Sequence, residues 1–220
     1  MQAMTGGLME LLAKGGVVMI PLAICSVVGL AIFIERLALF ARTPASRPEL
    51  AQDVGRLLAA GDVAGAFALL GRDRSPLARL LSYMLSVHDL PKPAQSTAMV
   101  LGAAIEAVVK EFGRLVGALA IIANIAPVLG LLGTVLGMIR AFMAVEAMGA
   151  RVNPSALAGG IWEALITTAV GLCVALPATL AHSYLASRVE ALQSELHQAA
   201  NLLVAELAAA QDGQAPEGRP

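Results

Sequence analysis

The chain has 220 residues, of which 58% are hydrophobic and only 14% are charged, and its mean hydropathy is +0.76. A soluble domain of this size carries about a quarter charged residues, so this composition excludes an ordinary soluble protein. The formal net charge of −1 indicates no partner by itself, and we expect neither nucleic-acid binding nor a cofactor.

Three runs contain no Asp, Glu, Lys or Arg: residues 15–34, 115–139 and 164–187. Each run reaches the ~20 residues that an α-helix needs to cross ~30 Å of hydrocarbon. The runs lack the alternation of membrane strands, and three strands cannot close a barrel. The sequence therefore predicts an all-α membrane protein with three transmembrane helices. Spans two and three are expected to extend into the cytoplasm, next to a small cytoplasmic helical insert.

In chain order, residues 1–14 are expected to form a short external segment and residues 15–41 the first transmembrane helix. This first span has no small-residue cleavage site before "ERLALFAR", so we interpret it as a retained span and not as a signal peptide. Residues 42–93 are the cytoplasmic helical insert. Its helices have local signals: Gly61 follows the first, Asp62 caps the second, and Ser75 with Pro76 begins the third.

Residues 94–145 contain no strong helix breaker before Pro127, so we expect one long helix there that includes transmembrane helix two. Residues 146–155 form the expected external loop, and residues 156–210 a long helix with transmembrane helix three. An approximate apolar stripe follows this third span, made of Val189, Leu192, Leu196, Leu203 and Leu207. Residues 211–220 are expected to be a disordered tail.

Basic residues predict the orientation. The segment 36–114 holds ten of the fifteen Lys and Arg residues. The positive-inside rule therefore places this segment and the C-terminus in the cytoplasm, and the N-terminus outside.

Small residues recur at three- and four-residue steps along one face of spans two and three. Such faces let helix backbones approach closely. They are explained either by packing between the two spans or by a narrow path around which copies assemble, and the pattern leaves both open. The residues are Ala123, Ala126, Gly130, Thr134, Gly137 and Ala141 in span two, and Ala164, Thr168, Gly171, Ala175, Ala178 and His182 in span three.

Two hydroxyls on these faces have matched depth. Thr134 lies five residues before the end of its charge-free run, and Thr168 lies five residues after Glu163. Both are therefore expected roughly 7 Å inside the outer boundary, in one polar layer. Threonine can also bond a carbonyl of its own helix, so neither residue alone indicates a path.

Glu163 precedes the third charge-free run and is expected at membrane depth, where an ionised carboxylate costs on the order of 2.5–3.5 kcal/mol. Arg140 is the candidate ion-pair partner. The alternative is an interfacial acid that stabilises the helix N-terminus through the backbone dipole.

Pro127 and Pro177 lie inside spans two and three, and we expect each to kink its helix. Cys25 and Cys173 are expected to be packing residues. Neither they nor Ser26 has a nearby His or Asp in the sequence, so we expect no enzyme, no catalytic residue and no metal site.

Two motifs carry a resemblance that covers roughly residues 8–205: "IAPVLGLLGTVLGMIRAF" and "LAGGIWEALITTAVGLCVALPATLAHSY". Together with the three-span order, they resemble the MotA/TolQ/ExbB proton-channel family, and within it the ExbB and TolQ branch. In this family the pore threonines match Thr134 and Thr168, and the glutamate of span three matches Glu163.

The resemblance implies a proton-conducting stator-type subunit in the bacterial inner membrane. It implies a homo-oligomer, a pentamer, around two copies of a single-span ExbD/TolR-like protein with a titrating Asp. Through a TonB- or TolA-like effector, the complex would use the proton motive force to energise outer-membrane transport or envelope processes. A non-conducting membrane scaffold and a small transporter subunit stay open as alternatives.

Overall fold

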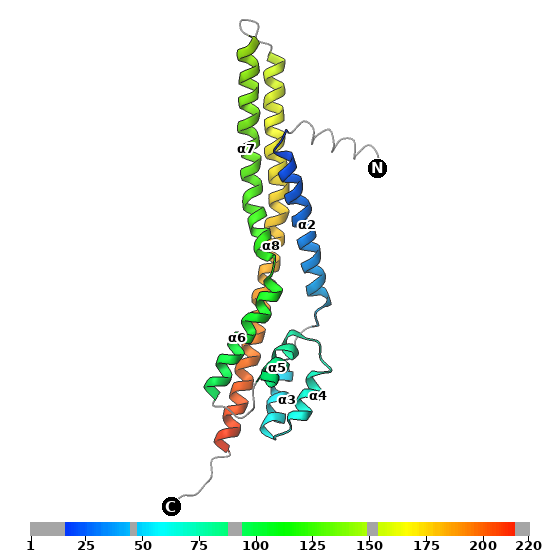
Figure 1. Ribbon diagram of the computed structural model, residues 1–220, viewed down its shortest axis with the longest axis vertical. Coiled ribbons are helices and arrows are strands. Elements are labelled where there is room, and N and C mark those ends of the chain that lie inside the picture. Colours follow the sequence, from blue (N-terminus) through cyan, green and yellow to red (C-terminus); the bar gives the residue numbers. More distant parts are fainter. Residues whose placement is uncertain (1–15, 45–47, 88–93, 149–153, 214–220) are drawn as a thin grey trace, which may run out of the picture. The chain divides into compact units, whose positions relative to one another are not determined.

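The computed structural model describes residues 16–44, 48–87, 94–148 and 154–213, and these ranges contain helices and turns but no strand. The expected external segment 1–14 and most of the tail 211–220 lie outside the described residues, as does part of the loop 146–155. The helices are α2 (Met19–Arg42), α3 (Pro48–Ala59), α4 (Val63–Leu70), α5 (Pro76–Val87), α6 (Ala94–Gly113), α7 (Val116–Met148) and α8 (Pro154–Gly213) (Figure 1).

Three of these helices contain segments long and apolar enough to cross a membrane: Met19–Arg42, Val116–Ala147 and Leu157–Ala205. The predicted all-α membrane protein with three transmembrane helices is confirmed. α8 has 60 residues and includes residues 211–213, which we expected in the tail.

The single helix predicted over residues 94–145 is interrupted. α6 ends at Gly113 and α7 begins at Val116, with a turn at Arg114 and Leu115. Leu115 has φ 67°, in the left-handed region that a helix cannot continue through. Its carbonyl accepts from the N–H of Ala118 at 3.0 Å, so the helical ladder restarts there. Gly113 was the one local sign of this stop, since glycine is common at helix C-termini.

The chain divides into two compact units, residues 1–35 with 115–184 and residues 36–114 with 185–220. In the first unit, α2 packs on α7 and α8. Its buried core holds Val18 just before α2, Met19 and Leu22 of α2, Ala126 of α7 and Ala175 of α8. Leu129, Ile166, Val170 and Val174 pack against them.

The second unit has a larger helical core, to which α3, α4, α5, α6 and the last part of α8 all contribute. Leu80 of α5, Ile105 of α6 and Leu196 of α8 are almost fully buried in it. The two predicted caps are formed. Asp62 Oδ1 accepts from the N–H of Gly65 at 2.8 Å, and Ser75 Oγ accepts from the N–H of Ala78 at 3.2 Å.

Candidate functional site

Helices α7 and α8 of the first unit run side by side with their backbones in close contact (Figure 1). A Cβ atom added to Gly171 would lie 2.7 Å from the carbonyl oxygen of Ala126 and 3.0 Å from Cα of Gly130. A Cβ on Gly137 would lie 3.0 Å from Cβ of Ala164. Side chains larger than hydrogen would force these helices apart.

The small-residue faces are therefore used in packing between the two spans, the first of the two explanations. Ala126, Gly130, Gly137 and Ala141 of α7 are buried, as are Ala164, Gly171, Ala175 and Ala178 of α8. Thr134, Thr168 and His182 are only partly buried.

The hydroxyls of Thr134 and Thr168 meet at one turn of α7. Thr168 Oγ1 donates across the helix pair to the carbonyl oxygen of Gly130 at 3.0 Å. Thr134 Oγ1 donates to the carbonyl oxygen of Leu131 at 2.6 Å, within its own helix. Two hydroxyls from two helices thus end on successive carbonyl groups. A hydroxyl keeps its lone pairs while it donates, so both oxygens can still accept hydrogen bonds.

Glu163 forms an ion pair with Arg140, since Arg140 Nη1 lies 2.9 Å from Glu163 Oε1. Arg140 Nε donates to the carbonyl oxygen of Leu136 at 3.3 Å, which holds the guanidinium along α7. The chain just before α2 adjoins this pair: a Cβ added to Gly16 would lie 2.7 Å from Arg140 Nη2 and 3.0 Å from Glu163 Oε1. The pair thus lies where all three spans of the first unit meet.

The ion pair and the two hydroxyls lie on opposite sides of the α7–α8 contact. At 3.6 residues per turn, Thr168 is rotated by about 140° from Glu163 around α8, and Thr134 by about 120° from Arg140 around α7. Ile166 and Val170, which neighbour Glu163 on its side of α8, pack against the core that contains α2. Glu163 and Arg140 therefore face α2, and the hydroxyls lie at the other edge of the contact.

Thr167 was not among the predicted site residues, although its side chain is more buried than that of Thr168. Its side chain is 1% exposed, and Oγ1 donates to the carbonyl oxygen of Glu163 at 3.0 Å. A Cβ on Gly133 would overlap the Thr167 side chain. The available signal was the glycine spacing in "GLLGTVLG", which provides the space for a threonine on the facing helix.

Pro127 and Pro177 lie inside continuous helices, α7 and α8. Pro177 lines a cavity of about 600 Å³ between α2, α7 and α8, together with Cys25, Cys173 and Tyr184. Cys25 is partly buried and Cys173 is exposed. In the part of the chain that the structure describes, no three His, Cys, Asp or Glu residues are close enough to bind a metal ion.

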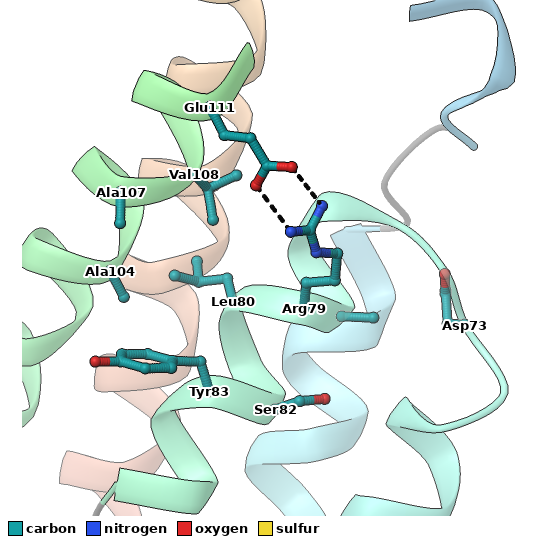
Figure 2. A pocket seen from close by; sticks show the side chains of 10 residues that line it. Asp73, Arg79, Leu80, Ser82, Tyr83, Ala104, Ala107, Val108 and Glu111 are labelled. Atoms are coloured by element: carbon teal, nitrogen blue, oxygen red, sulfur yellow. Dashed lines mark hydrogen bonds and ion pairs between the residues drawn. The ribbon is translucent and has the colours of Figure 1, made fainter. Parts of the chain in front are cut away.

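The second unit has a groove of about 440 Å³ between α5 and α6 (Figure 2). Arg79 and Glu111 bridge it with contacts of 2.8 and 3.5 Å between their guanidinium and carboxylate groups. Both side chains are about half exposed, at 54% and 53%. Pairs this exposed contribute little to stability, and nothing in the groove indicates a ligand.

These features define a helical membrane protein with three spans. Two of the spans pack closely against each other and carry polar side chains at the edges of their contact. The model of the MotA/TolQ/ExbB proton channel family matches residues 72–198. The chain belongs to this family. Three apolar helices together with the family indicate a protein of the inner membrane.

The similar proteins point to the ExbB/TolQ branch. A biopolymer transport protein ExbB homolog from Methanothermobacter thermautotrophicus is 28% identical over 186 residues. These residues are 84% of this chain and 65% of that protein. An ExbB-like biopolymer transport protein of Synechocystis is 35% identical over 83% of this chain and 72% of its own length. The biopolymer transport protein ExbB of Salmonella typhimurium is 32% identical over 81% and 75%. The chain thus spans between about two thirds and three quarters of these relatives.

Proposed function

We propose that this chain is a proton-conducting, stator-type subunit that uses the proton motive force to energise outer-membrane transport or envelope processes. It does so as a homo-oligomer, a pentamer, around two copies of a single-span partner of ExbD/TolR type. A TonB- or TolA-like effector receives the motion. The N-terminus lies outside and the C-terminus in the cytoplasm, as the basic residues of segment 36–114 favour.

The observation that carries the proposal is the pair of hydroxyls of Thr134 and Thr168 on successive carbonyl groups of α7. They are polar groups at membrane depth, partly exposed at the edge of a helix contact that is built mainly of glycine and alanine. Their side of the α7–α8 contact points away from α2 and so is available to a neighbouring helix. Family membership supplies the function that such polar atoms serve.

The proposed path runs past these hydroxyls. Glu163 lies at the other edge of the α7–α8 contact, toward the outer end of α8, and borders the outer mouth of the path and not the hydroxyl layer. An ionised carboxylate on a partner helix would be costly in hydrocarbon. Water and the threonine hydroxyls lower this cost when they donate hydrogen bonds to the carboxylate, because an ionised carboxylate only accepts them. The partner carboxylate can then take a proton on one side of the hydroxyl layer and release it on the other. The close-packed glycine and alanine residues keep α7 and α8 together while the partner helix moves.

Native mass spectrometry of the full chain, extracted gently from its own membrane, tests the assembly. Five copies with two copies of a small single-span protein are expected. Proton flux into vesicles made from the same membrane tests conduction, and Thr134→Val with Thr168→Val is expected to abolish most of it. Intact flux and intact energised activity in this double variant would contradict the path and favour the non-conducting scaffold or the small transporter subunit.

A further inference from the structure

The ion pair between α7 and α8 has two features that a chance surface pair lacks. Arg140 is held twice, by Glu163 at 2.9 Å and by the carbonyl oxygen of Leu136 at 3.3 Å. Glu163 is the more enclosed partner, with its side chain 29% exposed against 52% for Arg140. The arginine therefore fixes where the carboxylate of Glu163 lies, since its own position is set by α7.

Gly16 forms the third side of this junction. It has φ +67°, a conformation that favours glycine, and its carbonyl accepts from the N–H of Met19 at 3.1 Å as α2 begins. A Cβ there would lie 2.7 Å from Arg140 Nη2, 3.2 Å from Arg140 Nη1 and 3.0 Å from Glu163 Oε1. A side chain at residue 16 and the Arg140–Glu163 pair thus compete for one space.

We propose that Arg140 is a positioning residue for Glu163, and that Gly16 keeps the space that their ion pair requires. The start of α2 thereby controls the carboxylate at the outer end of the path. This inference rests on the proposed function, because it concerns the acid of that path. It adds Arg140 as a residue that acts through Glu163. It also adds the contact at Gly16, through which the first span affects conduction.

A double-mutant cycle tests the role of Arg140. Proton flux is measured in vesicles with the full chain and its partners, at matched amounts of assembled complex. Arg140→Gln is expected to lower flux on the order of tenfold, because misplacing a reacting group by about 1 Å can cost up to 100-fold. Arg140→Lys, which retains the charge, is expected to recover part of this loss. In a Glu163→Gln background, Arg140→Gln is expected to have no further effect, since residues that act through one contact are not additive.

Gly16→Ala and Gly61→Ala form a matched pair. Both residues have positive φ, +67° and +79°, but a Cβ on Gly61 would meet nothing within 4 Å. Backbone strain is therefore common to both variants, and only Gly16→Ala disturbs the ion pair. Gly16→Ala is expected to lower flux as Arg140→Gln does, and Gly61→Ala is expected to leave flux unchanged.

Additive losses in the cycle would overturn the role of Arg140, and equal flux in the two alanine variants would overturn the role of Gly16. Both failures are distinct from failure of the proposed function. If Thr134→Val with Thr168→Val abolishes flux while Arg140→Gln does not change it, the path stands and the inference is wrong. If the wild-type vesicles with all partners conduct no protons, the proposed function itself is wrong.

Discussion

The hydroxyl of Thr168 on α8 donates a hydrogen bond to the carbonyl oxygen of Gly130 on α7, at 3.0 Å. This bond joins two helices of the first unit at Gly130, where a Cβ atom would lie 3.1 Å from Cα of Thr168. It forms at the edge of the α7–α8 contact, where a polar group can also be reached by a neighbouring helix. The same bond thus contributes to packing and, in the proposed function, to the path.

Thr168→Val retains the shape of the side chain and removes the hydroxyl. Hydrogen bonds between membrane helices average about 0.6 kcal/mol, so a small loss in the free energy of unfolding is expected. Proton flux is expected to fall about tenfold, which corresponds to about 1.4 kcal/mol in the barrier. Thr43→Val is the control, because Thr43 Oγ1 donates to the carbonyl oxygen of Leu39 at 2.7 Å, outside the α7–α8 pair. Equal flux in the two variants would remove Thr168 from the path.

Gly171→Ala tests the backbone contact between α7 and α8. The added Cβ would lie 2.7 Å from the carbonyl oxygen of Ala126, so the helices must separate. Overpacking of this kind costs about 1–3 kcal/mol, to be measured as the free energy of unfolding in detergent. Gly159→Ala in the same helix is the control. Its Cβ would meet nothing within 4 Å, and replacing a helical glycine by alanine gains up to about 1 kcal/mol. A stable Gly171→Ala variant would show that the helices do not touch as described.

The groove between α5 and α6 is lined by both buried and half-exposed side chains, whose contributions to stability are expected to differ (Figure 2). Leu80 has 0% exposure, and Leu80→Ala is expected to lower the free energy of unfolding by about 2–5 kcal/mol. Arg79→Gln breaks the half-exposed pair with Glu111 and is expected to cost at most about 1 kcal/mol, less at high salt. Denaturant unfolding of the full chain measures both. A larger effect from Arg79→Gln than from Leu80→Ala would mean that the ion pair holds α5 on α6.

Ser75→Ala removes the cap of α5. Ser75 is fully buried, and its Oγ accepts from the N–H of Ala78, so the variant leaves a buried donor without its bond. Caps of this kind are worth about 0.5–2 kcal/mol. Ser86→Ala near the other end of α5 is the control, because Ser86 Oγ is exposed and donates to the Tyr83 carbonyl. The midpoint of thermal unfolding is expected to fall for Ser75→Ala only; equal midpoints would mean that the cap is dispensable.

Local signals predicted local structure well. Asp62 and Ser75 were expected to cap α4 and α5, and both do so. Of the apolar stripe expected after the third span, Leu192, Leu196 and Leu203 are buried in the core of the second unit, and Val189 is partly buried. The break at Leu115 was not predicted, because a left-handed leucine has no sequence signal and Gly113 alone does not require a stop.

By itself the sequence determined the three spans, the caps and the set of candidate polar residues, because hydrocarbon thickness and cap chemistry act within a few turns of chain. It could not decide which neighbour each face meets, since that depends on the register between helices distant in sequence. Only the tertiary structure decided that the small residues pack α7 against α8. It also paired Arg140 with Glu163 beside Gly16 and set Thr134 and Thr168 at the other edge. The reason is rotation: a few residues along a helix turn a side chain by more than 100°, from one neighbour to another.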